Sequence, residues 1–586
     1  MQESTLISGA WRFLPDIYGE GESFGWHTGG IDDSSWWEVD VPCTFDQCGE
    51  ELETHEGVGW FRRTVDVPQE WQGNRVTLHF GAANMNARVW VNGKLAGENH
   101  CGFLPFEFQV DELVEFGEQN TIVVWVDNTK LQTDVPGKLW GWRNFGGIIR
   151  DVHLNVSDPL HLQDIVISAE PTADGGALDV RCVAVNQRSE ALDVVLEVRA
   201  LDSDDNLLAE AQSEVALIAA ASSSALELSC GVPQALPWSP DSPSLYTVEM
   251  QLKVDDQVVA RDIRRTGFRT VSTDECQVLL NEQPIFMTGF NRHEDTVESG
   301  LVRNTEVARR DFVDMKQSGC NFVRLCHYPH DEAELDLCDE LGLLVMCEIP
   351  LYWWRGHSEV DEEQSNQKLQ AARQQLERLI ARDRNHPCVV FWSVSNECTE
   401  DAKEVREGIA ELCRLAKELD PSRLAVHASC YHKTDPSFDE DDVICINDYP
   451  GWGHGQCDLD DDGRHFSKAT EFWRRELTKL HELYPHKPIL IAEFGHPSIL
   501  GQRKVGLGED TQARALVAEF EAMKEPYMCG ALIWCYADHA WPAGSPFVGS
   551  MTTSPYGVQT RSRIKKSACA SIKKMFIEAQ DARGGS

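Results

Sequence analysis

Long apolar runs and an excess of basic residues are both absent from the sequence. No stretch of the 586 residues approaches the roughly 18 consecutive apolar residues of a membrane-spanning helix, which excludes a protein with such a helix. Lysine and arginine number 53 against 95 acidic residues, and the net charge is -42. A surface of this charge repels nucleic acid and anionic membranes, so we expect neither as a partner.

The N-terminal segment and the cysteines bear on the cellular compartment. Residues 1–13 lack the basic start and apolar run of a secretory signal, so we expect a cytoplasmic protein, or a periplasmic one if a signal has been removed. The 19 cysteines are odd in number, scattered, and without a Cys-x-x-Cys pair. This pattern favours reduced, buried thiols over disulfides.

Signatures of a cofactor are missing as well. No Gly-rich phosphate loop follows the first predicted strand of the C-terminal half, which argues against a nucleotide-binding open sheet. His293, His327 and His330 are not spaced as a His-x-x-x-His pair on one helix, and other polar contacts explain them equally well. We therefore expect no metal site and no required cofactor, with a structural or assisting cation left open.

The first 272 residues have the pattern of two all-β domains. Residues 1–157 contain short strands with alternating apolar positions, such as RVTLHFG at 75–81, separated by turn signals such as Asn92-Gly93. This pattern predicts a β-sandwich. Residues 158–272 continue with about seven strands at lower aromatic content, which predicts an immunoglobulin-like β-sandwich.

Residues 273–586 change to short apolar runs that alternate with amphipathic helical segments. Near-continuous apolar strands between helices predict a parallel sheet covered by helices, and about eight such units predict a (β/α)8 barrel. A doubly wound open sheet is the alternative. The predicted strands are residues 284–291, 321–329, 343–350, 389–397, 424–430, 442–450, 488–495 and 530–538.

The predicted strands end in polar and aromatic residues that would meet at one rim of the barrel. Core packing does not explain them, because a buried charged group without a partner is costly. The C-terminal ends of the strands are where such barrels place their active sites. The residues are Asn291, Arg292, His293, Glu294, Asp295, Arg324, His327, Tyr328, Glu348, Asn396, Glu397, Asn447, Asp448, Tyr449, Glu493, Trp534 and Asp538.

Two of these carboxylates, Glu397 and Glu493, end the fourth and seventh predicted strands. From nearly opposite sides of the rim they could approach to about 5 Å, the separation of a retaining glycosidase pair. For the other rim carboxylates we expect ion pairs with Arg292 or Arg324. These are Glu294, Asp295, Glu348 and Asp538.

Neighbouring residues are candidates for supporting roles. We expect Arg324 to keep Glu493 ionised, unless it serves only a structural ion pair. Asn396 is placed to donate to the sugar 2-hydroxyl, and Trp534 to stack on the sugar unless it is a core tryptophan. Tyr449 could bind the nucleophile, with Phe494 shaping its pocket, while Cys398 lacks a histidine partner and is expected to pack.

Motifs over nearly the whole length resemble glycoside hydrolase family 2, which contains β-galactosidases, β-glucuronidases and β-mannosidases. They include NFGGIIRDV at 144–152, GFNRHED at 289–295, NFVRLCHYP at 321–329, SVSNE at 393–397 and IAEFG at 491–495. The resemblance implies a sugar-binding jelly roll at residues 1–157, an immunoglobulin-like domain at 158–272 and a catalytic barrel at 273–586.

The same resemblance implies roles at individual positions. Glu397 falls on the acid/base position and Glu493 on the nucleophile position of the family. We expect the remaining site residues to bind substrate. They are Asn396, His327, Arg324, Trp534, Tyr449, Asn447 and Glu348.

The sequence departs from the family where the sugar is selected. β-Glucuronidases have an Asn-x-Lys motif before a glycine-containing turn that binds the sugar carboxylate, and here the residues before Gly557 are Ser554-Pro555-Tyr556. An acidic residue near the end of the first domain is also replaced, in the segment 139–143. The segment 539–556 is instead rich in apolar side chains, namely Trp541, Phe547, Met551 and Tyr556.

Such a lining suits a neutral sugar, so we expect hydrolysis of terminal β-D-galactosyl residues from oligosaccharides. Arg561 and Arg563 lie nearby, which keeps a β-glucuronidase or β-galacturonidase as the main alternative, followed by a β-mannosidase. An inactive carbohydrate-binding relative is the non-enzymatic alternative. We expect an oligosaccharide or β-glycoside as the substrate, and a dimer or tetramer is a further expectation from the family.

Overall fold

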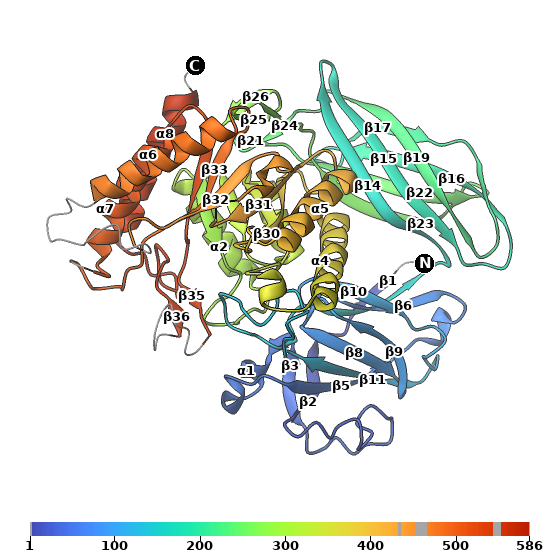
Figure 1. Cartoon of the computed structure of the whole chain (residues 1–586). Coiled ribbons are helices and arrows are strands. Elements are labelled where there is room, and N and C mark those ends of the chain that lie inside the picture. Colours follow the sequence, from blue (N-terminus) through green and yellow to red (C-terminus); the bar gives the residue numbers. More distant parts are fainter. Residues whose placement is uncertain (1–2, 432–434, 453–465, 505, 543–551, 585–586) are drawn as a thin grey trace.

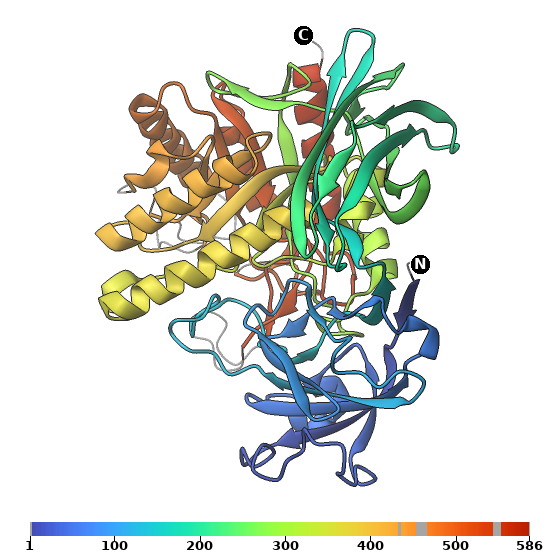
Figure 2. The same ribbon diagram turned by 90° about the vertical axis from the view of Figure 1, so that its right-hand side faces the viewer.

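The computed structural model describes residues 3–431, 435–452, 466–504, 506–542 and 552–584. Figures 1 and 2 show a helix-covered barrel with the N-terminal β-sandwich below it and the second β-sandwich beside it. The predicted fold class is thereby confirmed. No helix of the described ranges is long and apolar enough to cross a membrane.

The N-terminal sandwich packs a six-stranded sheet against a four-stranded one, with side chains such as Phe61 and Leu78 in one core. A short third sheet, β4-β12-β7, lies next to them. The six-stranded order is β3 (Trp37–Val41), β2 (Gly9–Asp16), β5 (Val58–Asp66), β11 (Gln119–Asp127), β8 (Asn86–Val91) and β9 (Lys94–Asn99). The four-stranded order is β1 (Glu3–Leu6), β13 (Val152–Ser157), β6 (Arg75–Phe80) and β10 (Phe106–Gln109). The third sheet comprises β4 (Cys43–Thr44), β12 (Gly147–Ile148) and β7 (Ala83–Asn84).

The second sandwich follows the period-two rule closely, because alternate residues of its strands face the core. Strand β15 (Gly175–Asn186) shows this alternation of buried and more exposed residues over its length. The first sheet adds β14 (Leu160–Thr172) and β19 (Ser222–Pro233). The second sheet has the order β17 (Leu207–Gln212), β16 (Leu192–Leu201), β22 (Tyr246–Val254) and β23 (Gln257–Thr266), with β18 (Ala216–Ile218) paired to β16.

Eight parallel strands close the C-terminal barrel in sequence order. They are β27 (Met287–Arg292), β28 (Phe322–Leu325), β29 (Leu344–Glu348), β30 (Val389–Asn396), β31 (Leu424–Ser429), β32 (Ile444–Asn447), β33 (Ile489–Phe494) and β34 (Met528–Ile533). All residues of these strands are buried, which explains why the sequence reads as continuous apolar runs. Each predicted run overlaps one strand, but several strands end earlier than expected.

Helices cover the barrel and begin at recognisable caps. Asp331 caps α3 by accepting from the Ala333 N–H, and Gly342, with φ of 69°, ends that helix in the left-handed conformation. Between β31 and β32 the described residues contain a 3-10 helix, Ser437–Asp439, in place of an α-helix. The helices are α2 (Thr305–Gln317), α3 (Glu332–Leu341), α4 (Glu362–Asp383), α5 (Lys403–Leu419), α6 (Phe466–Leu483), α7 (Glu509–Phe520) and α8 (Ala568–Gly584).

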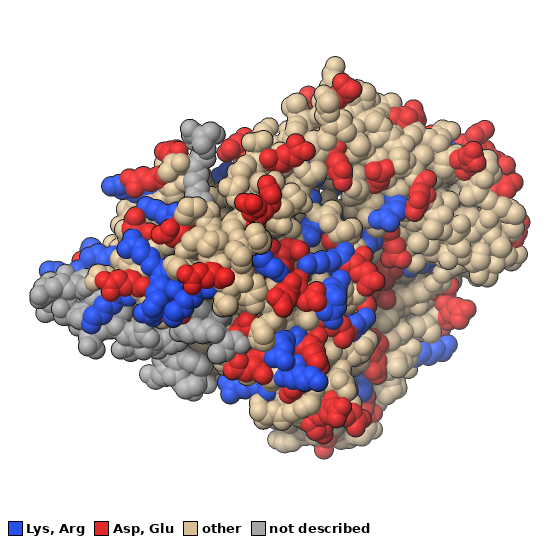
Figure 3. Space-filling model, turned by 45° about the horizontal axis from the view of Figure 1, so that its top comes forward, with Lys and Arg blue, Asp and Glu red and all other residues tan. Residues whose placement is uncertain are grey.

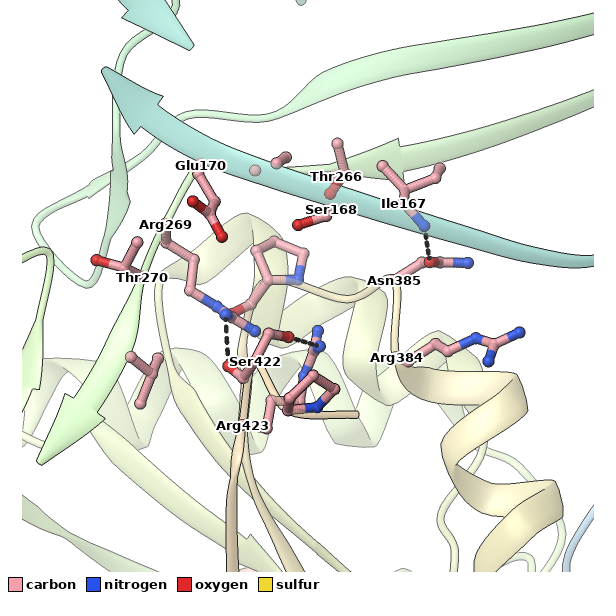
Figure 4. A pocket seen from close by; sticks show the side chains of 15 residues that line it. Ile167, Ser168, Glu170, Thr266, Arg269, Thr270, Arg384, Asn385, Ser422 and Arg423 are labelled. Carbon is pink, nitrogen blue, oxygen red and sulfur yellow. Dashed lines mark hydrogen bonds between the residues drawn. The ribbon is translucent and has the colours of Figure 1, made fainter. Parts of the chain in front are cut away.

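Buried arginines attach the β-domains to the barrel. Arg150 of the first domain forms ion pairs of 3.3 Å with Glu294 and with Asp331. Arg269 follows the second sandwich and donates to the backbone carbonyls of Pro387, Val389 and Ser422. Figure 4 shows this second junction, which encloses a polar cavity of about 170 Å³ between β14 and the barrel. The surface itself has mixed charge, and Figure 3 shows acidic and basic side chains side by side on one face.

Candidate active site

Most of the predicted site residues meet at the C-terminal ends of the barrel strands. Five of them lie within strands, and four follow a strand directly or in the next turn. The first group is Arg324, Glu348, Asn396, Asn447 and Glu493, and the second is His327, Glu397, Tyr449 and Trp534. Several strands are shorter than predicted because their pairing with the neighbouring strand becomes irregular near the rim, where the backbone turns away.

Arg324 is the centre of a fully buried hydrogen-bond network. Its guanidinium donates to Glu348 Oε2 at 2.6 and 2.9 Å, to Glu493 Oε1 at 2.6 Å and to Asn396 Oδ1 at 2.7 Å. Burial would lower the pKa of Arg324, but the carboxylates of Glu348 and Glu493 outweigh it and raise the pKa above its usual value. Arg324 is therefore a fixed positive charge beneath the site.

Glu348 lies under the site surface rather than on it. Its side chain has no exposed area, and its oxygens also accept from Ser393 Oγ at 2.7 Å and lie 2.8 Å from His327 Nδ1. The expected ion pair with Arg324 is present, and Arg324 also has no exposed side-chain area. Substrate binding by Glu348 and Arg324, expected from the sequence, stays a prediction.

His327 is held as a neutral ring between two tryptophans. Burial lowers its pKa to about 4, although Glu348 opposes this effect. With Nδ1 donating to Glu348, Nε2 is the unprotonated nitrogen, and it lies 3.9 Å from Glu493 Oε1. The ring stacks on Trp534 with centroids 5.1 Å apart and on Trp142 with centroids 5.9 Å apart. Trp142 comes from the N-terminal domain and was not among the predicted site residues.

Glu493 is bound on both carboxylate oxygens. Arg324 donates to Oε1, and Tyr449 Oη donates to Oε2 at 2.5 Å. Burial raises the pKa of Glu493 to about 8, Arg324 opposes the rise, and the negative charge of Glu397 adds to it. The two carboxylates therefore interact electrostatically across the rim, as a paired arrangement requires.

Glu397 has neutral partners instead. Trp353 Nε1 donates to its Oε2 at 2.9 Å, and Asn447 Nδ2 donates to its Oε1 at 2.9 Å. The residue has a φ of 50°, a left-handed conformation that is strained for a non-glycine residue and is typical of functional sites. Its N–H donates to the carbonyl of Ala428 on β31, which holds this turn in place. Trp353 was also missed, because no spacing rule relates it to Glu397.

Trp534 is 7% exposed and lies one residue beyond β34. Its ring also meets those of His293 and His539 edge-on, and Tyr449 and Tyr556 pack against the cluster that contains it. The small exposed area shows that most of this side chain is packed against its neighbours. Stacking of Trp534 on a sugar stays a prediction.

The other rim carboxylates have cationic partners that the sequence did not suggest. Glu294 pairs with Arg150, Asp295 with Arg561 at 2.7 Å, and Asp538 with Lys566 at 2.9 Å. Of the four carboxylates expected to pair with Arg292 or Arg324, Glu348 alone does so among the described residues, with Arg324. Arg292 is engaged by Asp311 and Glu334. The expected pairings were wrong because the true partners come from another domain and from the C-terminal segment.

The segment that replaces the Asn-x-Lys motif lies close to the nucleophile. The Tyr556 and Tyr449 rings meet edge-on with centroids 5.7 Å apart. Arg561 and Arg563 are both engaged by carboxylates, and Lys566 is buried on Asp538. Phe547 and Met551, which were expected to line the sugar pocket, lie outside the described residues.

Three groups of described side chains have the spacing of metal ligands. His293, Cys326 and His327 form one group at the rim, but His327 is engaged by Glu348 and burial raises the pKa of the Cys326 thiol well above its usual value. His330 is paired with Glu334. The second group is Asp339, His386 and Cys388, and the third is Glu400, His427 and Asp435.

A closed (β/α)8 barrel with two interacting carboxylates at its rim, preceded by two β-sandwiches, has the architecture of a glycoside hydrolase. Three family models match the chain in succession: the family 2 sugar-binding domain at residues 22–158, a family 2 model at 160–269 and the family 2 TIM-barrel domain at 271–563. The chain belongs to glycosyl hydrolase family 2.

Similar proteins of known name cover almost the entire chain. The β-glucuronidase of Paenibacillus borealis is 28% identical over 98% of this chain and 96% of its own length, and that of Felis catus is 28% identical over 92% and 85%. Among solved structures, a β-glucuronidase of an uncultured Clostridium species superposes with a TM-score of 0.87 at 26% identity over 98% of both chains. That of Dictyoglomus thermophilum gives 0.85 at 25% identity, over 98% of this chain and 97% of its own.

Proposed function

We propose that this chain is a retaining exo-β-glycosidase in which Glu493 is the nucleophile and Glu397 the acid/base. The observation that carries this proposal is the contrast between the two carboxylates. Glu493 is bound by the cation of Arg324 and by Tyr449, whereas Glu397 is bound by the neutral groups of Trp353 and Asn447. Environments that differ in this way separate the roles of two acids at one pH.

Arg324 and Tyr449 favour the charged form of Glu493, which suits a nucleophile, and we assign the acid/base role to Glu397. Glu397 then protonates the leaving oxygen while Glu493 attacks the anomeric carbon and forms a glycosyl-enzyme ester. In the second step Glu397 removes a proton from water, which displaces Glu493 and releases the sugar with its original configuration.

Asn396, His327, Asn447, Tyr449 and Trp534 are the residues that we propose to contact the sugar. The Asn396 Oδ1 accepts from both Arg324 and Asn447, which orients its Nδ2 for donation to the 2-hydroxyl. Trp534 presents its exposed edge, and the neutral His327 offers Nε2 as an acceptor. Arg324 and Glu348 act from below by holding these groups in position.

We propose a β-D-glucuronide as the substrate. The support is the set of relatives, which are named β-glucuronidases and match over nearly the full length. A terminal β-D-galactoside, expected from the sequence, has no such support from the comparisons. It remains the second candidate because Ser554 and Tyr556 stand where an Asn-x-Lys motif would bind a carboxylate and because Tyr556 packs beside Tyr449.

A panel of aryl β-glycosides tests both the glycosidase activity and the choice of sugar. We expect hydrolysis of the glucuronide with kcat/KM at least about tenfold above that of the galactoside, galacturonide and mannoside, since one lost polar contact is worth about 1.4 kcal/mol or more. A faster galactoside would reverse the choice of sugar. Absence of turnover on all four would favour an inactive carbohydrate-binding relative.

The nucleophile is tested separately by Glu493→Ala. We expect loss of turnover, with unchanged circular dichroism and thermal midpoint as the check on folding. Addition of azide should restore cleavage of an activated aryl glycoside and yield the α-glycosyl azide, because the anion enters the space of the missing carboxylate. Wild-type activity in Glu493→Ala, or a first-formed α-anomer from wild-type enzyme, would contradict the assignment.

A further inference from the structure

A second buried cluster lies behind the acid/base turn and takes no part in the proposed reaction. Glu400 belongs to the loop between β30 and α5, three residues after Glu397. His427 is on β31, next to the residue whose carbonyl accepts from the Glu397 N–H. Asp435 follows β31, and one ligand atom of each of these three side chains lies within 4.8 Å of the others.

Glu400 is the unusual member of this cluster. It has no exposed surface, and among the described residues neither of its carboxylate oxygens has a hydrogen-bond partner. A buried carboxylate in that condition costs several kcal/mol, and a bound cation would satisfy it.

The histidine has the surroundings of a metal ligand. One ring nitrogen, Nδ1, lies 2.7 Å from Asp441 Oδ2, and the other, Nε2, lies 2.9 Å from Asp435 Oδ2. A histidine that binds a metal through one nitrogen typically directs the other to a carboxylate, which fixes the ring. Here Asp441 takes that outer position, and Nε2 faces the same space as Asp435 and Glu400.

The carboxylates of the cluster are also arranged as metal ligands would be. Asp435 Oδ1 is occupied by the backbone N–H of Ser437 at 2.7 Å, which leaves Oδ2 on the side of His427. Among the described residues, His427 is the one ion-pair partner of Asp435 and Asp441, and the buried carboxylate of Glu400 has none. The cluster is therefore short of positive charge.

We propose that Glu400, His427 and Asp435 form a binding site for a divalent transition-metal ion. One nitrogen and two oxygen ligands suit ions such as Zn²⁺ and Mn²⁺. Ligand atoms around such an ion, at about 2.0–2.2 Å from it, lie about 3.4 Å apart, so the side chains need only a modest contraction. The ion would supply the missing partner of Glu400 and tie the acid/base turn to β31. The proposal does not depend on which sugar is cleaved.

Metal content of the full chain tests the proposal. Protein freed of metal with EDTA is incubated with ZnCl₂ or, in parallel, MnCl₂, which thiols bind weakly, then desalted and analysed by mass spectrometry for bound metal. We expect about one ion per chain with at least one of the two salts. The variant Glu400→Gln, which keeps the shape of the side chain, should lose that ion. Asp401→Asn, at the exposed neighbouring acid, should keep it.

A thermal measurement separates metal binding from a folding defect. In EDTA, Glu400→Gln should unfold at the same temperature as the wild type or higher, because the buried charge is gone. The effective salt should raise the midpoint of the wild type and of Asp401→Asn by about 2–4 °C, with no rise in Glu400→Gln. Binding of neither ion by the wild type, or equal metal content and equal midpoint shifts in Glu400→Gln and the wild type, would overturn the proposal.

Discussion

The hydroxyl of Tyr449 offers a direct test of how the nucleophile is kept ionised. Its hydrogen bond of 2.5 Å to Glu493 Oε2 favours the charged carboxylate, and Tyr449→Phe removes this bond while the ring remains. A hydrogen bond to a charged group contributes about 1.5–3 kcal/mol, and 1.36 kcal/mol corresponds to one pKa unit. The substitution should therefore raise the pKa of Glu493 by about 1–2 units.

The sign of this shift determines the pH profile. Because the donor stabilises the ionised form, its removal makes Glu493 take up a proton at higher pH, so the acid limb of kcat/KM should move upward by about 1–2 units. At pH values below the acid limb, kcat/KM should fall about 10- to 100-fold in Tyr449→Phe, and the fall should be smaller at the wild-type optimum.

The assay is kcat/KM for an aryl glycoside between pH 4 and 10, measured for the wild type and Tyr449→Phe at equal ionic strength. Tyr484→Phe serves as the matched control, since Tyr484 lies on the barrel surface beyond the end of α6. A fall in kcat/KM without movement of the acid limb would refute the reasoning. Tyr449 would then position the substrate rather than tune the nucleophile.

Three further changes test other parts of the structure. Glu348→Gln removes the charge that holds Arg324 and His327, and we expect a loss of about 3–5 kcal/mol in unfolding free energy, measured by denaturant titration, together with a lower kcat. Arg269→Met should lower that free energy by about 1–3 kcal/mol with KM unchanged, because buried carbonyls lose their donor far from the rim. Arg561→Gln should raise KM for an aryl glucuronide about tenfold while KM for an aryl galactoside is unchanged, if that arginine binds a sugar carboxylate. Equal effects on both substrates would exclude this role.

The barrel could be predicted from the sequence because its strands are buried on both faces. Such strands leave continuous apolar runs, and each of the eight runs overlaps one observed strand. The ends of the strands were harder to predict from the sequence. Trp534 and His327 were expected within strands but lie beyond β34 and β28, because the polar rim makes irregular turns that periodicity does not register.

The partners of charged residues could not be predicted, because they depend on contacts between distant segments. Arg150 is 144 residues from Glu294, and Arg561 is 266 residues from Asp295. Trp142, which stacks on His327, was not predicted as a site residue for the same reason. Local motifs identify the residues of a site, whereas the fold determines which of them meet.

The choice of sugar depends on where a substrate carboxylate would find a cation. The described basic residues nearest the Ser554-Pro555-Tyr556 segment are already paired, since Arg561 binds Asp295 and Lys566 binds Asp538. Arg561 nevertheless lines a cavity of about 280 Å³ between the N-terminal domain and the C-terminal segment, and its side chain is 19% exposed. A glucuronide carboxylate that reached it would share the guanidinium with Asp295, because the several N–H donors of one arginine can serve two carboxylates. Recognition of an acidic sugar without an Asn-x-Lys motif is thus physically consistent with this site, provided that Asp295 shares its partner.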